Sequence, residues 1–144
     1  MHNLTSPPGL LFSVQETRHQ ALLRTGQARS VFLQGAYPFA GRGFFEPQLL
    51  HNELRYAVPE GASAELVYFR AGNLSDDLIY ITVWKDGAAI RYFPIGPKSD
   101  CHVSLAIVES HPAGTAFDVR LAAPRGLTGS VVLDIGLLEV REEG

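Results

Sequence analysis

The sequence predicts an all-β fold, a single-domain antiparallel β-sandwich of jelly-roll type with eight or nine short strands. Three observations predict it. Short segments that alternate polar and apolar residues recur about every ten residues along the chain. The 14 glycines and 9 prolines stand mostly between these segments, where turns are needed. No long segment has the apolar period of a crossover helix, which excludes a parallel α/β sheet.

Length and composition fit one soluble globular domain. The chain has 144 residues, of which 46% are hydrophobic and only 19% are charged. A chain of this size buries roughly 70% of its unfolded surface, which is enough for a real core. The formal charge of −3 provides no basic patch, so neither nucleic acid nor an anionic membrane is expected as a partner. The low charged fraction favours a surface covered by another copy or by a protein partner.

Cysteine usage and the N-terminus indicate the compartment. The single Cys101 excludes an internal disulfide and any metal cluster of several cysteines. Residues 1–9 contain two consecutive prolines and predict a flexible lead-in. The N-terminus lacks the regions of a signal peptide, and no apolar run approaches the ~20 residues that span a bilayer. We therefore expect a cytoplasmic protein.

The N-terminal third gives the weakest signals. Residues 10–16 alternate and predict a strand. Residues 17–24 fit either a short helical turn, with capping-box spacing of Thr17 and Gln20 and with Gly26 at its end, or a continuation of that strand. The next three segments predict a strand, a loop and a second alternating strand: residues 29–37, 38–47 and 49–58.

The clearest signal is a hairpin within residues 64–94, where a strand over residues 65–71 precedes two strands joined at Asp86-Gly87. Both central residues of a type I′ turn need a positive φ, which Gly adopts freely and Asp better than most residues. This loop predicts that Val83 faces Ile90 across the hairpin. Side chains alternate between the two faces of a sheet. One face is then aliphatic, with Ile79, Ile81, Val83, Ile90 and Tyr92. The other face is aromatic, with Tyr80, Thr82, Trp84, Arg91 and Phe93.

Three more strands are predicted after the hairpin, over residues 101–108, 115–121 and 130–140. In the second of these, Phe117, Val119 and Leu121 point inward, whereas Asp118 and Arg120 point outward. The last strand is apolar on both faces, which predicts a central position in its sheet. Asp134 and Gly136 interrupt one of its faces, which indicates a β-bulge or a buried polar contact.

The first candidate functional surface is the aromatic face of the hairpin, with Tyr80, Trp84, Arg91 and Phe93. Aromatic rings stack on sugars and on planar ligands, and a guanidinium group supplies hydrogen bonds. The favoured alternative is that this face packs against the second sheet or against another subunit. Trp84 lies next to the turn, so we expect it to be the most exposed of the four.

The second candidate is the loop at residues 35–47, with Arg42 as the polar anchor of a binding site. Exposure of both Phe44 and Phe45 is unfavourable, so this loop either folds onto the core or docks a partner. It does not fit a phosphate-binding loop, because no Lys-Ser/Thr pair follows Gly41-Arg42-Gly43.

Metal binding is the third possibility. His51 and Glu53 share one face of a predicted strand, and with His102 they form the ligand set of an alternative, a small cupin-like metal enzyme with its site inside a barrel. However, the sequence has no His-x-His, HExxH or CxxC motif. Residues 73–77 carry calcium-type oxygen ligands, but they fit better a turn whose side chains bond to their own backbone.

These observations predict a non-catalytic binding or accessory module without a cofactor. It self-associates or docks a protein partner through an apolar and aromatic sheet face. A glycan or another small molecule is the further class of ligand that such a face suits.

Overall fold

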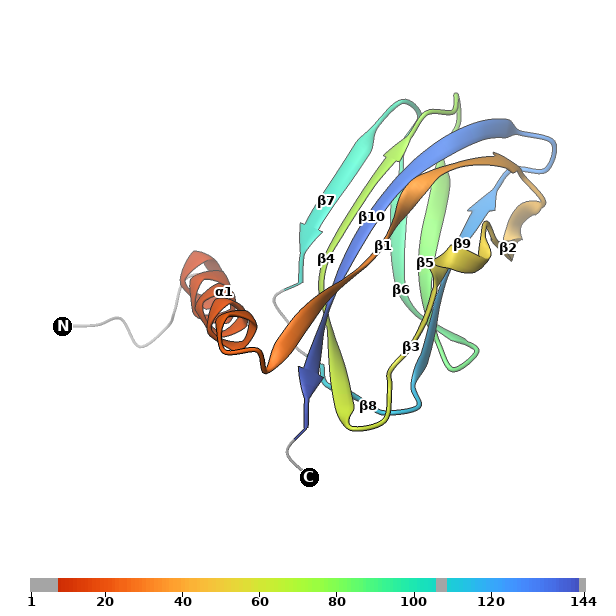
Figure 1. The fold of residues 1–144 in the computed structure, drawn as a ribbon. Coiled ribbons are helices and arrows are strands. Elements are labelled where there is room, and N and C mark those ends of the chain that lie inside the picture. Colours follow the sequence, from red (N-terminus) through yellow and green to blue (C-terminus); the bar gives the residue numbers. More distant parts are fainter. Residues whose placement is uncertain (1–7, 106–108, 143–144) are drawn as a thin grey trace.

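The structure is a computed structural model that describes residues 8–105 and 109–142. Two antiparallel sheets face each other, and one helix, α1 (Pro8–Arg24), lies outside them (Figure 1). The predicted β-sandwich is confirmed, and its sheets do not close into a barrel. The described residues contain ten strands rather than eight or nine. The jelly-roll type of connection stays a prediction.

Sheet A has the strand order β1-β10-β4-β7, with β8 beside β4. Its strands are β1 (Ala28–Ala40), β4 (Ala62–Asn73), β7 (Asp100–Ser104), β8 (His111–Pro112) and β10 (Thr128–Arg141). Sheet B has the order β2-β9-β5-β6, with β3 beside β9. Its strands are β2 (Gly43–Leu49), β3 (Arg55–Ala57), β5 (Ile79–Lys85), β6 (Ala88–Ile95) and β9 (Ala116–Ala123).

The N-terminal segment is helical, so the strand predicted at residues 10–16 is wrong. Residues 1–7 of the predicted lead-in lie outside the described residues, and Pro8 already begins α1. The end of the helix matches the sequence signal. Gly26 has a φ of +77°, and the N–H groups of Gly26 and Gln27 donate to the carbonyls of Leu23 and Leu22. This pair of bonds is a Schellman motif, which needs the left-handed conformation that glycine adopts freely. No described helix is long and apolar enough to cross a bilayer.

The hydrophobic core lies between the sheets. Phe117, Val119 and Leu121 point into it from β9, as predicted. Phe69 of sheet A and Phe93 of sheet B stack in the core with ring centroids 3.8 Å apart and an interplanar angle of 6°. This stack joins the two sheets.

The hairpin turn has the predicted conformation, but the strands that follow it pair in a different register from the predicted one. Asp86 and Gly87 have φ values of 49° and 83°, as a type I′ turn requires. The ladder then shifts by one residue, so that Val83 pairs with Arg91 instead of Ile90. A bulge of one residue in β6 causes the shift, and it inverts every side chain that follows. The predicted faces are therefore wrong for Arg91, Tyr92 and Phe93, whereas Ile90, the bulged residue, still packs against the core. Phe93 is buried, whereas Tyr92 is 63% exposed.

The predicted strand over residues 49–58 is also interrupted. A 3₁₀ helix, η1 (Asn52–Leu54), breaks it, because the Glu53 N–H donates to His51 Nδ1 at 3.0 Å and Leu54 turns into the core. The predicted loop at residues 38–47 belongs largely to the ends of β1 and β2. In the predicted strand 101–108, β7 covers residues 100–104, and residues 106–108 lie outside the described residues.

The turn predicted at residues 73–77 is built around the buried side chain of Asn73. Its Nδ2 donates to the carbonyls of Asp77, Ile95 and Gly96 at 2.8–3.1 Å. Its Oδ1 accepts bonds from the N–H and the hydroxyl of Ser75. These contacts connect the turn after β4 to the end of β6.

β10 occupies the predicted central position, between β1 and β4. The register of β10 against β4 shifts between Gly136 and Leu137, so that Val67 has no partner residue on β10. The ring of Tyr68 lies over Gly136, where a Cβ atom would clash with it. The Tyr68 hydroxyl donates to Asp134 Oδ1 at 2.7 Å. The predicted polar contact is present, and the predicted bulge lies in β4, opposite Gly136 and Leu137, rather than in β10 itself.

We expect Gly136→Ala to lower the free energy of unfolding by roughly 1–3 kcal/mol, because the added methyl group meets the Tyr68 ring. Urea denaturation measures this loss. Gly72→Ala is the matched control, since Gly72 also lies in sheet A and a Cβ atom there meets nothing within 4 Å. An equal loss in both variants would contradict the packing of Tyr68 on Gly136.

Candidate functional site

The outer face of sheet B holds only part of the predicted aromatic surface. Tyr80 and Trp84 lie on it, on the side of β5 opposite to the buried Ile79, Ile81 and Val83. Phe93 lies in the core. Arg91 lies on the same side of the sheet as Val83, and its guanidinium donates to the Ile90 carbonyl and to Glu109. The bulge in β6 is the reason for both differences.

Tyr92 and Phe44 take the places of the two missing residues. Together with Tyr80 they form an aromatic strip, and we keep this name for the three. The Tyr80 ring lies 6.1 Å from each of the other two ring centroids, tilted by 13° to Phe44 and by 44° to Tyr92. The Tyr80 hydroxyl donates to the Phe44 carbonyl. Burial, with the neighbouring Tyr92, raises the pKa of Tyr80 above its ordinary value, so the hydroxyl stays a donor.

Phe44 reaches Tyr80 because β2 leaves its ladder with β9. Gly43 pairs with Ala123 and Gln48 already pairs with Leu121, so residues 44–47 bulge out of the sheet. Phe44 packs on the sheet face, whereas Phe45 is 96% exposed. Arg42 is exposed as well. Phe44 therefore packs on the outer face of sheet B rather than on the core, and docking of a partner by this segment stays a prediction.

Trp84 is half-buried, as Tyr80 is, so the expected exposure of its ring is not found. The Arg120 guanidinium lies 3.9 Å above the centre of its ring, a cation–π contact. The Trp84 Nε1–H donates to the Thr82 hydroxyl at 2.8 Å, and the Arg120 Nε–H donates to Asp118 at 2.7 Å. Asp118 and Arg120 point outward, as the alternation predicts. Their contact with Trp84 arises because β9 lies beside β5, and alternation along one strand does not reveal which strand is its neighbour.

The residues of the metal alternative lie on different parts of the sandwich. His51 Nδ1 is 3.8 Å from a carboxylate oxygen of Glu53 at η1, and both side chains are largely exposed. His102 lies on β7 of sheet A. Within residues 8–105 and 109–142, no group of three or more His, Cys, Asp or Glu side chains is placed to hold a metal ion. These three residues therefore do not form the barrel-interior site of that alternative.

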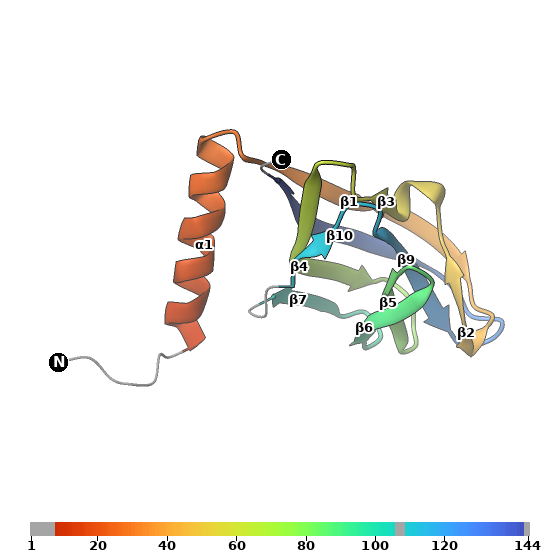
Figure 2. The same cartoon turned by 90° about the horizontal axis from the view of Figure 1, so that it is seen from below.

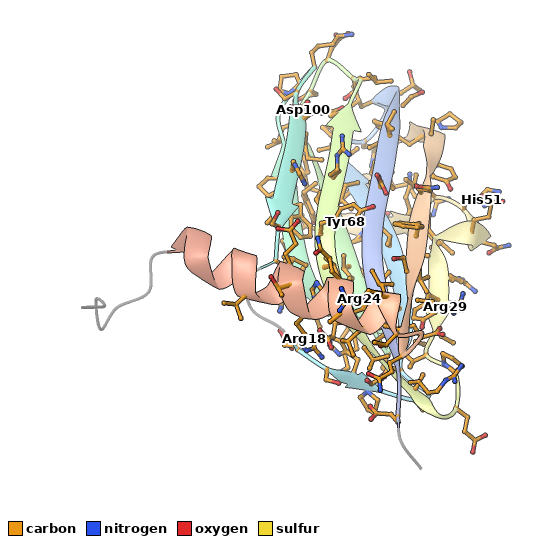
Figure 3. All side chains as sticks on the ribbon, turned by 60° about the vertical axis from the view of Figure 1, so that its left-hand side comes forward. Arg18, Arg24, Arg29, His51, Tyr68 and Asp100 are labelled. Atoms are coloured by element: carbon orange, nitrogen blue, oxygen red, sulfur yellow. The ribbon has the colours of Figure 1, made fainter. Side chains whose placement is uncertain are left out.

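Helix α1 covers one end of the outer face of sheet A. Figure 2 shows it on the side of this sheet that faces away from sheet B, and Figure 3 shows it crossing the strands below Tyr68. Arg18 donates two hydrogen bonds to Glu65 of β4, at 2.7 and 2.8 Å. The Glu65 side chain is only 3% exposed, so this bidentate pair also supplies the partner that a buried carboxylate needs.

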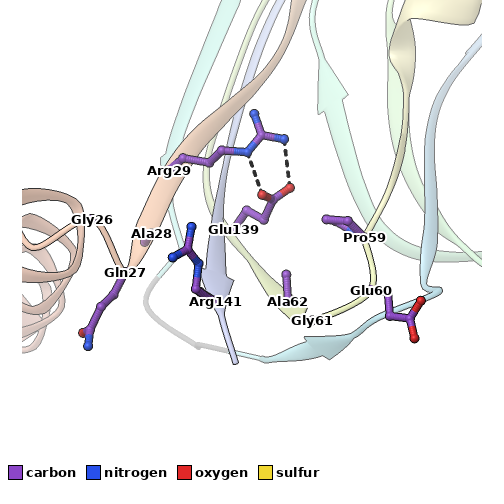
Figure 4. A pocket seen from close by; sticks show the side chains of 10 residues that line it. All are labelled: Gly26, Gln27, Ala28, Arg29, Pro59, Glu60, Gly61, Ala62, Glu139 and Arg141. Atoms are coloured by element: carbon purple, nitrogen blue, oxygen red, sulfur yellow. Dashed lines mark hydrogen bonds and ion pairs between the residues drawn. The ribbon is translucent and has the colours of Figure 1, made fainter. Parts of the chain in front are cut away.

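A small cavity of about 190 Å³ lies where the start of β1, the turn before β4 and the end of β10 meet (Figure 4). Its central charges are paired within the protein. Glu139 accepts bonds from Arg29 at 2.6 and 3.0 Å and from the Tyr56 hydroxyl at 2.6 Å. The bonds from Arg29 hold the pKa of Glu139 below its ordinary value. Because Tyr56 belongs to sheet B and Glu139 to sheet A, the pair joins the sheets at this end.

We expect Glu139→Gln to lower the free energy of unfolding by about 1–2 kcal/mol at neutral pH, since charge-assisted bonds are lost. Because the pKa of Glu139 is lowered in the folded state, its ionised carboxylate stabilises the fold fully above the unfolded pKa of about 4.3. This stabilisation is lost as the pH falls through the folded pKa. The difference between wild type and variant should therefore shrink below about pH 4. Urea denaturation at several pH values measures it, and a difference that does not change with pH would contradict the assignment.

Comparisons with known proteins assign neither a family nor a function to this chain. No family model and no curated protein matches the chain. Among solved structures, a pilus protein of Bacillus endospore appendages is 11% identical, with a TM-score of 0.40, over 82% of this chain and 93% of that chain. The CBM36-1 domain of a multidomain xylanase from the hindgut metagenome of Trinervitermes trinervoides is 10% identical, with a TM-score of 0.46, over 76% and 96%. A chain of the infectious bursal disease virus Gx strain is 13% identical, with a TM-score of 0.49, over 81% and 32%.

Proposed function

We propose that the protein is a non-catalytic module that self-associates, and that two copies meet through the outer face of sheet B. The observation that carries this proposal is the aromatic strip with Phe45 on the neighbouring bulge of β2. Phe45 and Tyr92 are 96% and 63% exposed, although each is a large apolar or aromatic side chain. Aromatic residues are enriched in the cores of protein interfaces, where their burial contributes most of the affinity.

The charges on this face favour a second copy as the occupant. A twofold contact brings the same patch of both subunits together, so an uncompensated charge would meet its own like. The guanidinium of Arg120 is already paired with Asp118 and lies on the Trp84 ring. Around the aromatic strip, the face therefore presents neutral aromatic surface beside an internally compensated ion pair, which is compatible with self-complementary packing. The exposed Arg55 lies on the same face but farther away, on β3 at the other side of β9.

Sedimentation equilibrium at concentrations up to about 100 μM tests the proposal, and we expect a dimer. Phe45→Ser and Tyr92→Ser should each weaken the dimer by about tenfold or more, because they remove exposed aromatic contacts. At concentrations low enough for the wild type to be monomeric, both variants should melt at the wild-type temperature, since both side chains are exposed in the single chain.

Phe32→Ser is the matched control, because Phe32 is a half-exposed aromatic residue on the other sheet. It should leave the association unchanged. A wild-type chain that stays monomeric over this range would overturn the proposal, and so would a dimer that neither Phe45→Ser nor Tyr92→Ser weakens.

A further inference from the structure

A row of polar side chains crosses the outer face of sheet A, one from each of four adjacent strands. Gln34 of β1 pairs with Asp134 of β10, Asp134 with Arg70 of β4, and Arg70 with His102 of β7. All four lie on the side opposite to the core, because their strand neighbours are packed inside the sandwich: Leu33, Leu133, Ile135, Phe69 and Ala71. With adjacent strands ~4.8 Å apart, this polar row extends about 14 Å.

A hollow lies beside the polar row, with Gly72 as its floor. Gly72 pairs with Val132 on one side and with Asp100 on the other, and a Cβ atom on it would meet nothing within 4 Å. Together with residues of the polar row, these three line a cavity of about 480 Å³. Ligand pockets have volumes of roughly 300–1,000 Å³. Figure 3 shows this face, with Asp100 at one end of it and α1 crossing beyond Tyr68.

The side chains of the polar row keep most of their hydrogen-bonding groups free for a ligand. Within the described residues, the side chains of Gln34, Arg70 and His102 make no hydrogen bond, and Arg70 comes no closer than 3.9 Å to Asp134. Asp134 uses its Oδ1 for the Tyr68 hydroxyl, whose pKa burial and this bond raise to about 12. Its Oδ2 accepts no hydrogen bond from the described chain. The sheet therefore holds unused donors and acceptors at fixed spacing.

The mixture of charges selects the chemistry of the ligand. The carboxylates of Asp100 and Asp134 would repel an anion, whereas the guanidinium of Arg70 would repel a cation. Hydroxyl groups both donate and accept hydrogen bonds, so an uncharged polyhydroxylated ligand suits both kinds of side chain. Phe32 and Val132, which are 50% and 44% exposed, provide apolar surface on the same face for the C–H groups of such a ligand.

We propose that the outer face of sheet A binds a neutral carbohydrate chain along the polar row, with one sugar ring in the Gly72 hollow. This site is separate from the proposed dimer face, which belongs to the other sheet. It also differs from the glycan surface expected around Trp84, where Arg120 already covers one side of the ring.

Affinity electrophoresis on gels that contain a β-glucan, a xylan, a mannan or an α-glucan tests the proposal. We expect at least one of these neutral polysaccharides to retard the wild-type chain. Gly72→Leu fills the hollow without removing a contact, so it should abolish the retardation while the melting temperature is maintained. Arg70→Ala removes donors from the polar row and should weaken binding by about tenfold or more. The second variant tests the site even if the first affects folding.

Phe45→Ser and Tyr92→Ser are the controls on the other sheet. With a short oligosaccharide of the retarding polymer, to which a dimer adds no avidity, both should bind as the wild type does. Because these variants should change the association state and not sugar binding, the experiments distinguish a failure of the dimer proposal from a failure of the carbohydrate proposal. No retardation by any neutral polysaccharide would overturn the inference. Unchanged binding by both Gly72→Leu and Arg70→Ala, or stronger retardation by a polyuronate or by chitosan, would overturn it as well.

Discussion

One extra residue in β6 decides which aromatic side chains of the hairpin are buried. Strand side chains alternate with a period of two, so a shift of one residue moves every later side chain to the other face. In the observed register, Phe93 stacks on Phe69 and joins the two sheets, while Tyr92 points outward beside Tyr80. The opposite register would place the Tyr92 hydroxyl in the core, where an unpaired polar group is costly, and would expose Phe93 instead. The bulge thus places the apolar ring of Phe93 in the core and the amphipathic ring of Tyr92 on the surface.

The two outer faces of the sandwich have different chemistry as a result of strand order. On sheet B, the aromatic strip combines residues from β2, β5 and β6, and the Arg120–Asp118 pair beside it is internally compensated. On sheet A, the polar row takes one residue from each of four strands and leaves most of their hydrogen-bonding groups unused. A contact between copies through the first face would leave the second open, so the proposed self-association and the proposed ligand binding would not compete for the same surface.

Two glycines, Gly136 and Gly72, shape sheet A in opposite ways. Gly136 provides the space that the Tyr68 ring fills, and this places the Tyr68 hydroxyl on Asp134. Gly72 provides space that no side chain fills, which leaves the hollow beside the polar row. The first position serves packing, whereas the second leaves room for a ligand. Only the neighbouring strands distinguish the two cases.

The sequence by itself determined the local features of this protein. Asp86-Gly87 specified the turn, the alternation around Val119 specified which side of β9 is buried, and Asp134 with Gly136 marked the place where the β10–β4 ladder is irregular. Tertiary structure decided the helical state of residues 8–24, the break at η1, the bulge in β6 and the order of the strands. The physical reason is range. Turn conformation and alternation depend on residues that are neighbours in the chain, whereas register and strand order depend on packing energies such as that between Phe69 and Phe93, which no local pattern contains.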